Sequence, residues 1–457
     1  MSISETGAPT PIAVIILAAG QGTRMNSDLP KPLHKLGGVP LIAHALHAAS
    51  TLSPARIVVV TGHGADAVEK TVAELAPWAE YVRQTEQLGT GHAVLQAAPL
   101  LADFSGDVIV LYADTPFISE ETLAAMQAAR AHHDIVVLGF EAADPGRYGR
   151  LIMDGERLLR IVEAKDATQA ERAVTICNSG LMAGDAATML GLLAKVGNHN
   201  AAGEYYLTDL PGLAVADGLS ATAILCPEAE TLGINSRIEL AQAEIAFQTA
   251  RRAAMLADGV AMQAPETVIF AQDTWVGRDA EIEPYVVFGP GVTVESGAHI
   301  RAFSHLEGAH VSAGAVIGPY ARLRPGAEIG NDARIGNFVE VKEAQIGEGA
   351  KVNHLSYIGD AEIGDASNIG AGTITCNYDG VMKHRTVIGR DVFVGSNTML
   401  VAPVSLGDRA MTASGSVITE DVAPGALALA RAKQVNKPGL AIRLMERLRA
   451  IKASKKG

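Results

Sequence analysis

The chain has 457 residues, too many for one ordinary domain, so two or three domains are expected. Its formal net charge of −13 and its pI of about 5.5 argue against a nucleic-acid or anionic-membrane partner, because such partners attract a basic surface. The three cysteines are far apart and form no CxxC pair, which excludes a disulfide framework or a zinc module and predicts a reducing, cytoplasmic location.

The start of the chain carries no recognisable targeting signal. The opening MSISETGAPTP contains Glu5 and no basic residue, whereas a secretory signal begins with a basic segment. The longest early apolar run, from Ile12 to Ala19, has about half or less of the ~20 residues that span a bilayer. We therefore expect neither secretion nor integral membrane association.

Residues 1–235 alternate short apolar runs with helical patterns. Continuous Val, Ile and Leu runs are typical of strands buried on both faces of a parallel sheet, and they occupy residues 12–17, 57–60, 108–111 and 135–138. The helical patterns lie at 40–49, 65–76 and 120–131. This order predicts a Rossmann-like α/β domain with a mostly parallel sheet.

A single helix is predicted to follow this domain. Residues 236–258 are rich in Ala, Glu and Arg and contain neither Pro nor Gly, and Gly259 comes next. Gly commonly ends a helix because it adopts left-handed backbone angles without strain. We expect a linker helix over 236–259.

Residues 260–457 are dominated by a period of six. A branched or aliphatic residue recurs every six positions from Val276 to Ile369, with three steps of five, and again from Ile388 to Leu406, often followed by Gly. A fixed period over such a length predicts a solenoid, and a hexapeptide period suits a parallel β-helix with one inward residue per hexapeptide. A β-sandwich is the alternative, but its strands would alternate with period two.

Two segments interrupt this repeat. Residues 375–386 (TCNYDGVMKHRT) break the period and are expected to project as a structureless polar insertion, the kind of segment that often carries function on a rigid scaffold. From Arg431 to the end, nine Lys and Arg residues stand against Glu446 alone, a net +8. This tail is expected to be a solvated basic helix end that could attract an anion.

A glycine-rich loop follows the first predicted strand. Gly20 and Gly22 would let backbone N–H groups cradle a phosphate chain, and Arg24 and Lys31 would add positive charge. The loop is neither a Walker A motif nor GxGxxG, and GxG alone would equally suit a tight turn. Asp114 follows the buried strand at 108–111, at the strand ends where α/β sheets bind ligands, although a lone Asp there is more often a helix cap or a turn residue.

The hexapeptide repeat contains a second set of chemical groups. Arg324 and Lys342 are eighteen residues apart and so should stack one coil apart on one face. Two adjacent cations repel unless an anion lies between them, which suits a sugar phosphate; scattered solvated charges are the alternative. His354 is a candidate general base, because a neutral imidazole can take a proton from an amine.

Longer strings carry a family resemblance. Leu17-Ala18-Ala19-Gly20-Gln21-Gly22-Thr23-Arg24-Met25 with Pro30-Lys31 resembles the sugar-nucleotide pyrophosphorylases. Matching strings follow in order at 84–93, 112–114, 148–150, 161–167, 178–180, 204–209 and 233–237. Over roughly residues 12–431 the chain resembles the bacterial bifunctional N-acetylglucosamine-1-phosphate uridyltransferases/glucosamine-1-phosphate acetyltransferases, which implies a left-handed β-helix.

The resemblance implies a role for individual residues of the first domain. Asp114 and Asn235 would bind Mg²⁺, while Arg24 and Lys31 would act in catalysis. The uridine nucleotide would be held by Leu17, Ala18, Ala19, Gly20, Gln84, Gly89 and Thr90. The sugar ring would be held by Gly149, Glu163 and Asn178. Ala113 departs from the family, which usually has Gly there.

The resemblance also implies roles in the β-helix. His354 would be the catalytic base of acetyl transfer. The sugar 1-phosphate would contact Arg324, Lys342, Tyr357, Asn368, Asn377, Tyr378 and Lys383. Acetyl-CoA would contact Ala371, Ser396, Ser414 and Arg431. Ser414 stands where some family members have Ala.

These assignments imply synthesis of UDP-N-acetylglucosamine, a precursor of peptidoglycan and lipopolysaccharide. Glucosamine 1-phosphate would be acetylated from acetyl-CoA, and N-acetylglucosamine 1-phosphate would then react with UTP and release pyrophosphate. Similar acyltransferases build their sites between neighbouring β-helices, so a homotrimer is expected. Two alternatives are a nucleotidyltransferase with a purely structural β-helix, disfavoured by His354, and a nucleotide sensor, disfavoured by the retained Lys31, Asp114 and Asn235.

Overall fold

The computed structural model describes residues 10–455, so Glu5 with the rest of residues 1–9, and Lys456 and Gly457, lie outside the described part. The chain separates into two compact units, Met1–Arg251 and Arg252–Gly457. The division falls inside helix α8 (Arg237–Ala257), the helix expected as a linker. Gly259 follows it with a φ of +90°, a left-handed angle that suits glycine.

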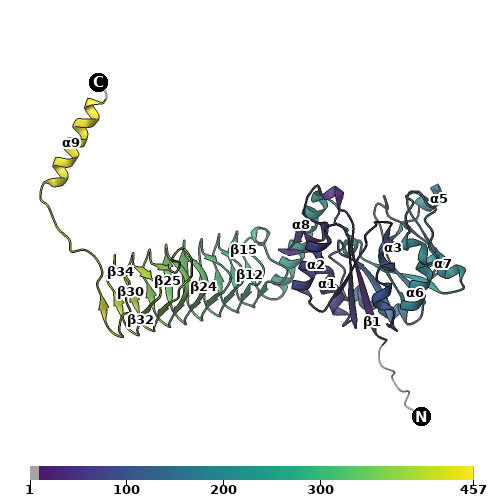
Figure 1. The fold of residues 1–457 in the computed structure, drawn as a ribbon, viewed down its shortest axis with the longest axis horizontal. Helices are drawn as coiled ribbons and strands as arrows, with labels where there is room; N and C mark the ends of the chain where they lie inside the picture. The colour runs from purple at the N-terminus through teal and green to yellow at the C-terminus, as the bar shows by residue number, and fades with distance from the viewer. Residues whose placement is uncertain (1–9, 456–457) are drawn as a thin grey trace, which may run out of the picture. The chain divides into compact units, whose positions relative to one another are not determined.

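The first unit is built on one nine-stranded sheet (Figure 1). The strand order is β5-β4-β1-β6-β10-β7-β11-β9-β8. The bounds are β1 Ile12–Ala18, β4 Arg56–Thr61, β5 Glu80–Arg83, β6 Asp107–Tyr112, β7 Ile135–Glu141, β8 Arg150–Asp154, β9 Arg157–Val162, β10 Ile176–Asp185 and β11 Ala221–Cys226. A small hairpin joins β2 (Lys35–Leu36) to β3 (Val39–Pro40).

Three helices of this unit, α1, α2 and α4, match the three predicted patterns to within about two residues at each end. The helices are α1 Leu41–Thr51, α2 Ala65–Leu75, α3 Thr90–Leu95, α4 Glu120–Arg130, α5 Gln169–Arg172, α6 Ala186–Leu193 and α7 Leu210–Ala216. Short 3-10 turns lie at Thr23–Met25, Lys31–Leu33, Ala98–Leu101, Leu207–Asp209 and Glu228–Thr231. The Rossmann-like arrangement with parallel strands is therefore confirmed.

Both faces of the sheet are buried, which explains the continuous apolar runs. Alternate residues of β1 belong to different core clusters: Val14 and Ile16 pack on one face, and Ala13 and Ile15 on the other. Parallel pairing joins β5, β4, β1 and β6, but β10 inserts antiparallel between β6 and β7, and β8 and β9 form an antiparallel pair. The sequence pattern did not predict this antiparallel part.

The second unit is a stack of coils whose short strands pair in parallel (Figure 1). One sheet has ten strands: β12 Ala261–Met262, β14 Glu281–Ile282, β17 His299–Ile300, β20 Val316–Ile317, β23 Arg334–Asn337, β25 Lys351–His354, β27 Asn368–Ile369, β30 Phe393–Val394, β33 Met411–Thr412 and β35 Leu427–Ala428. A 3-10 turn lies at Pro265–Thr267.

A second, branched sheet has fourteen strands. Its main path is β13 Trp275–Val276, β16 Thr293–Val294, β19 Ala309–Val311, β22 Ala327–Ile329, β24 Glu340–Ile346, β26 Tyr357–Ile363, β28 Ile374–Cys376, β31 Met399–Val401 and β34 Val417–Ile418. The branches are β15 Val287–Phe288, β18 His305–Leu306, β21 Arg322–Leu323, β29 Thr386–Ile388 and β32 Val404–Leu406.

The hexapeptide period corresponds to the interior of this β-helix. Ile317 pairs with Ile335, and Ile335 pairs with Val352, and all three side chains are fully buried. Where one of the three repeats in a coil has five residues, the coil has seventeen residues instead of eighteen. Leu323 pairs with Val341, so Arg324 and Lys342 lie on adjacent coils, as their spacing predicts.

The glycines that follow the inward residues allow the backbones of successive coils to pack closely. A Cβ on Gly336 would lie 1.9 Å from the carbonyl oxygen of Asn353 on the next coil, so only glycine fits there. The corner residues that adopt left-handed backbone angles come later in each hexapeptide, and some of them are aromatic. Tyr285, Phe303, Tyr320 and Phe338 all have positive φ angles and stack ring on ring, with centroids 5.0 to 5.4 Å apart.

The predicted polar insertion is ordered, and the expectation of a structureless segment was wrong. Tyr378 and Lys383 form an antiparallel bridge, and the N–H of His384 donates to the carbonyl of Asn377 (2.8 Å). The basic tail forms helix α9 (Leu440–Ser454). Among residues 10–455, no helix has the length and apolar character needed to cross a membrane.

Candidate functional site

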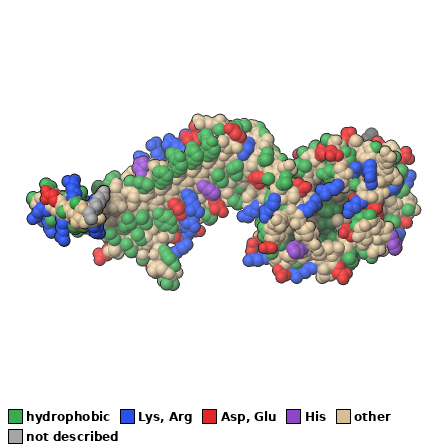
Figure 2. Space-filling view, turned by 90° about the horizontal axis from the view of Figure 1, so that it is seen from above, with side chains coloured by type: hydrophobic (Ala, Val, Ile, Leu, Met, Phe, Trp, Pro, Cys, Tyr) green, Lys and Arg blue, Asp and Glu red, His purple; other side chains and the backbone are tan. Residues whose placement is uncertain are grey.

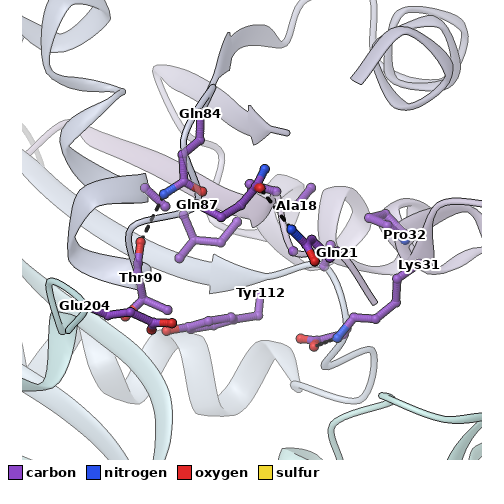
Figure 3. A pocket seen from close by; sticks show the side chains of 16 residues that line it. Ala18, Gln21, Lys31, Pro32, Gln84, Gln87, Thr90, Tyr112 and Glu204 are labelled. Atoms are coloured by element: carbon purple, nitrogen blue, oxygen red, sulfur yellow. Dashed lines mark hydrogen bonds and ion pairs between the residues drawn. The ribbon is translucent and has the colours of Figure 1, made fainter. Parts of the chain in front are cut away.

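A cavity of about 460 Å³ opens beside the glycine-rich loop (Figure 3). All seven residues expected to hold a uridine nucleotide line it: Leu17, Ala18, Ala19, Gly20, Gln84, Gly89 and Thr90. Gln84 is positioned by its own amide, which donates to the carbonyl of Gly89 (3.1 Å). We call this space the first cavity.

Several lining residues were not assigned from the sequence. They are Gln21, Pro32, Gln87, Ala93, Tyr112, Ala113 and Glu204. The side-chain amide of Gln21 donates to the amide oxygen of Gln87 (3.3 Å), which joins the glycine-rich loop to the segment that follows Gln84. The motif strings contained most of these residues, but no spacing rule marks which members of a string face the cavity.

The loop glycines have different roles. A Cβ on Gly20 would meet nothing within 4 Å, so its backbone faces open space. Gly22 has a φ of +61°, and a Cβ there would lie 2.7 Å from the Cβ of Lys31. Glycine at 22 therefore lets Lys31 pass close to the loop, and Figure 3 shows the Lys31 side chain extending along the cavity.

Three elements meet at the ammonium group of Lys31. Its Nζ donates to Asp114 Oδ2 and to Asn235 Oδ1 (2.9 Å). Asp114 follows β6, and the N–H of Ile234 donates to the Asp114 carbonyl (2.9 Å), which ties the two segments together. The carboxylate and the amide oxygen thus converge on one cation, although 121 positions (235 − 114) separate them in the sequence.

A second cavity of about 470 Å³ adjoins the first and shares Tyr112 and Asp114 with it. Arg24 and Asn235 line this second cavity together with Arg147, Tyr148 and Glu239. Arg24 therefore does not line the first cavity, where the nucleotide residues lie. The ring of Tyr112 packs so closely on Gly180 that a Cβ there would lie 2.8 Å from it, and burial raises the pKa of the Tyr112 phenol.

The three residues assigned to the sugar ring lie together. A Cβ on Gly149 would lie 3.6 Å from both Asn178 Cβ and Glu163 Oε1. The N–H of Asn178 donates to the Gly149 carbonyl (2.8 Å), and Thr208 donates to Glu163 (3.0 Å). Burial raises the pKa of the Glu163 carboxyl, and the Thr208 hydrogen bond only partly opposes this effect.

In the β-helix, His354 stands at an exposed end of β25. Its Nδ1 lies 3.0 Å from the amide oxygen of Asn337, on the preceding coil. An amide oxygen only accepts, so Nδ1 carries the hydrogen and Nε2 keeps a free lone pair. Asn337 was not identified from the sequence, because its role depends on pairing between coils.

The residues assigned to acetyl-CoA form a row that begins at His354. Each coil donates a backbone N–H to the one before: Gly372 to His354, Asn397 to Ala371, and Gly415 to Ser396. The guanidinium of Arg431 then donates to the Ser414 carbonyl (2.8 Å). The row therefore runs through His354, Ala371, Ser396, Ser414 and Arg431 on successive coils.

Most residues assigned to the sugar 1-phosphate gather elsewhere on the same unit, whereas Asn368 lies on the same sheet as His354. Asn377 donates to Asp360 and to the Tyr357 hydroxyl (3.3 Å), and Lys342 Nζ lies 3.9 Å from Asp360. The neighbouring Lys383 ammonium lowers the pKa of Lys342. On the coil before, Arg324 pairs with Glu340 (2.9 Å).

These carboxylates change the electrostatic argument for this cluster. Arg324 and Lys342 were expected to need an external anion between them, but Glu340 and Asp360 already offset their charge. The closer repulsion is between Lys342 and Lys383, which the ordered insertion brings together. An anion would relieve this repulsion.

The two groups of acetyl-site residues occupy different sheets. His354 and Asn368 lie on the ten-stranded sheet, whereas Lys342 and Tyr357 lie on the fourteen-stranded sheet. We call Lys342, Tyr357, Asp360, Asn377 and Lys383 the Lys342 cluster. Among residues 10–455, no hydrogen bond or ion pair joins His354 to this cluster. Tyr378 is exposed, and its hydroxyl donates within the insertion, to the Gly380 carbonyl (2.6 Å).

Comparisons with known proteins match both units. Residues 14–179 match a family model described as a MobA-like NTP transferase domain, and residues 306–422 match one described as a GMPPB C-terminal domain. A solved structure of UDP-glucose pyrophosphorylase complexed with UDP-glucose covers 53% of this chain and 100% of its own, with a TM-score of 0.44 and 19% identity.

Curated relatives match over nearly the whole chain. A protein named bifunctional protein GlmU from Jannaschia sp. (strain CCS1) is 69% identical and covers 98% of each chain. Proteins of the same name from Ruegeria sp. (strain TM1040) and Paracoccus denitrificans (strain Pd 1222) are 67% and 64% identical, each covering 97% of this chain and 99% of the relative.

Proposed function

The chain belongs to the family of bifunctional GlmU proteins, and from this premise we propose how its residues divide the two reactions. It is a bifunctional transferase that makes UDP-N-acetylglucosamine by an acetyltransferase and a uridyltransferase activity, so the function expected from the sequence is confirmed. The observation that carries the proposed division is that the chemical groups form separate clusters in the two units. Uridyl transfer is assigned to residues 1–235, and acetyl transfer to 260–457, with 236–259 as the linker.

The first cavity is proposed to hold UTP and the adjoining second cavity the acceptor. The backbone N–H groups of the glycine-rich loop bind phosphate oxygens, and Gln84 binds the base. A phosphate oxygen of N-acetylglucosamine 1-phosphate attacks the α-phosphorus of UTP, and the bond to the leaving pyrophosphate breaks. Gly149, Glu163 and Asn178 hold the sugar ring, while Lys31 and Arg24 offset negative charge on the phosphates.

Asp114 and Asn235 are the proposed holders of Mg²⁺. Their oxygens converge on the ammonium of Lys31, which supports a role for the pair in facing a cation. Within residues 10–455, no group of three His, Cys, Asp or Glu side chains gathers as a metal cage. Mg²⁺ commonly takes one or two protein ligands and completes its shell with water and phosphate, so this pair fits it. When bound, the ion neutralises charge on the phosphate oxygens.

Acetyl transfer is proposed to use His354 as its base. The amine nitrogen of glucosamine 1-phosphate attacks the thioester carbonyl, and the free Nε2 takes a proton from this nitrogen as the C–N bond forms. The C–S bond then breaks, and the proton passes from Nε2 to the sulfur, so coenzyme A leaves as the thiol. The row from His354 to Arg431 holds acetyl-CoA, and the Lys342 cluster with Arg324 and Tyr378 binds the sugar phosphate.

The same division supports a homotrimer, and membership of the family supports a left-handed β-helix. The base and the phosphate cluster lie on different sheets of one chain, so we infer that a complete site combines the ten-stranded sheet of one copy with the fourteen-stranded sheet of another. The stacked aromatic residues Tyr285, Phe303, Tyr320 and Phe338 are each 48% to 57% exposed, and hydrophobic side chains gather along this unit (Figure 2). Such a patch favours association. The three free cysteines favour the reducing cytoplasm.

A pair of variants tests the division of labour. Asp114→Ala should remove most Mg²⁺-dependent pyrophosphate release from UTP and leave thiol release from acetyl-CoA nearly unchanged. His354→Ala should lower thiol release roughly 10²–10⁴-fold, the usual scale for losing a general base, and leave pyrophosphate release intact. Each variant is the control for the other. Loss of both activities in either variant, with the oligomer intact, would contradict the division.

A further inference from the structure

Two arginines of the second cavity lack partners. Arg24 and Arg147 both line it, and neither has an ion pair or a side-chain hydrogen bond with any of residues 10–455. The carboxylates of the cavity are already engaged, because Asp114 accepts from Lys31 and Glu239 accepts from the N–H of Asn235 (2.7 Å). The two guanidinium groups are therefore available to an anionic ligand.

Neighbouring side chains hold the backbone around Arg147 in place. Arg150 is 3% exposed, and its guanidinium donates to the carbonyls of Tyr148 and of Gly146 (3.2 Å), the two neighbours of Arg147. The ring of Tyr148 packs edge-on against Phe140, with centroids 4.9 Å apart. A side chain on such an anchored turn loses less freedom when it binds a ligand than one on a loose loop.

The position of Arg147 relative to the two cavities indicates which substrate it contacts. It does not line the first cavity, where the nucleotide residues lie. Gly149, assigned to the sugar ring, follows two residues later on the same anchored turn. Tyr148 and Ser179, the chain neighbours of Gly149 and Asn178, line the second cavity, so we assign the anion that enters it as the phosphate of the acceptor.

We propose that Arg147 binds the phosphate of the acceptor sugar 1-phosphate and thereby sets the affinity of the uridyl site for that substrate. The inference rests on the proposed uridyl function of the first unit. The planar guanidinium can donate two parallel N–H groups to phosphate oxygens, which an ammonium cannot do. Arg24 lines the same cavity and supplies a second cation.

Steady-state pyrophosphate release with the full-length chain tests this role. Arg147→Ala should raise the KM for N-acetylglucosamine 1-phosphate about tenfold, the scale of one lost charge-assisted hydrogen bond, while the KM for UTP changes less than about twofold. Arg147→Lys should give a KM for the sugar phosphate between those of the unaltered chain and Arg147→Ala, because lysine keeps the charge but lacks the two parallel N–H donors. Raising the ionic strength should weaken the dependence on Arg147, since salt screens exposed charge.

Arg157→Ala is the matched control. Arg157 begins β9 in the same unit, is exposed and lines neither cavity, so its loss should change neither KM. Thiol release from acetyl-CoA reports that each variant is folded. An unchanged KM for the sugar phosphate, an equal rise in the KM for UTP, or a fall in kcat alone would overturn the inference. Absence of pyrophosphate release in the unaltered chain would instead overturn the proposed uridyl assignment.

Discussion

His354 can accept a proton only at Nε2, because Asn337 accepts the hydrogen of its Nδ1 (3.0 Å). The neutral amide holds the ring in one tautomer without adding charge. Such an arrangement suits a base that must be unprotonated near neutral pH. Asn337 is therefore a positioning residue for the acetyl site.

Replacing Asn337 should affect acetyl transfer in two separable ways. Asn337→Ala should lower kcat for acetyl transfer about tenfold, within the range of general-base effects, because the tautomer is no longer held. Asn337→Asp should move the acidic limb of the kcat/KM profile to higher pH, because a carboxylate stabilises the imidazolium. A pH series of thiol-release rates measures both. Asn331→Ala, at an exposed β-helix position, is the control, and an unmoved pH profile in Asn337→Asp would contradict the role.

Glu163 is predicted to make both stability and sugar binding depend on pH. Burial raises its pKa, so the folded chain binds a proton more readily than the unfolded chain. The ionised carboxylate is therefore unfavourable in the folded state above its folded pKa, and this penalty disappears as the pH falls through that value. Glu163→Gln should raise the melting temperature of the first unit at pH 7 and should flatten its pH dependence.

The same substitution separates stability from function. Glu163→Gln should raise the KM for N-acetylglucosamine 1-phosphate roughly tenfold, because a charged acceptor for the sugar hydroxyls becomes neutral. Differential scanning fluorimetry between pH 5 and pH 8, beside steady-state kinetics, measures both effects. A lower melting temperature at pH 7 would show that the Thr208 hydrogen bond outweighs the burial of charge.

At the scale of elements, one carboxylate makes several contacts within the insertion after β28. Asp379 accepts from the N–H groups of Val381 (2.8 Å) and Met382 (2.7 Å) and pairs with His384 (2.7 Å). His384, with these backbone bonds, lowers the pKa of Asp379. A depressed pKa means that this stabilisation is present above the ordinary Asp range and is lost only as the pH falls through the folded value. The insertion should therefore stay ordered at neutral and mildly acidic pH.

Asp379→Asn should loosen this insertion and weaken the acetyl site. The insertion carries Asn377 and Lys383 into the Lys342 cluster, so we expect the KM for glucosamine 1-phosphate to rise roughly three- to tenfold, the scale of one or two weakened hydrogen bonds. Hydrogen exchange of residues 377–385 should become faster. Asp391→Asn is the control, since it also lies at an exposed turn but outside the insertion. If exchange becomes faster but the KM for glucosamine 1-phosphate stays normal, the order of the insertion does not control substrate binding, and the prediction is contradicted.

At the scale of the whole molecule, the placement of the acetyl residues predicts complementation between copies. His354→Ala and Lys342→Ala should each be nearly inactive alone in acetyl transfer. If each site combines His354 of one copy with Lys342 of another, random mixing in a cyclic trimer leaves about a quarter of the sites intact. Dissociation and reassembly of the two variants together should therefore restore about a quarter of the activity.

Two measurements support or refute this prediction. Sedimentation or light scattering should report a trimer for the unaltered chain and for both variants. Uridyl transfer should be unaffected in each, because its residues lie in the other unit. A trimer that forms from the mixed variants but recovers no acetyl transfer would show that both groups act within one copy.

The features that the sequence determined are those with a local period. Inward residues of a β-helix must repeat once per hexapeptide, and Ile317, Ile335 and Val352 are buried where the period places them. Strands covered on both faces must be apolar throughout, as β1 is, and the long motif strings identified the family and part of the lining of the first cavity.

The remaining features depend on which segments meet in space, and no local pattern contains that information. The antiparallel insertion of β10, the convergence of Asp114 and Asn235 on Lys31, and the second cavity with Arg147 all join distant segments. The hydrogen bond from His354 to Asn337 depends on the register between coils. Only the tertiary structure decided that the acetyl residues lie on two sheets, because a coil turns its corner between His354 and Tyr357, three positions apart in the sequence.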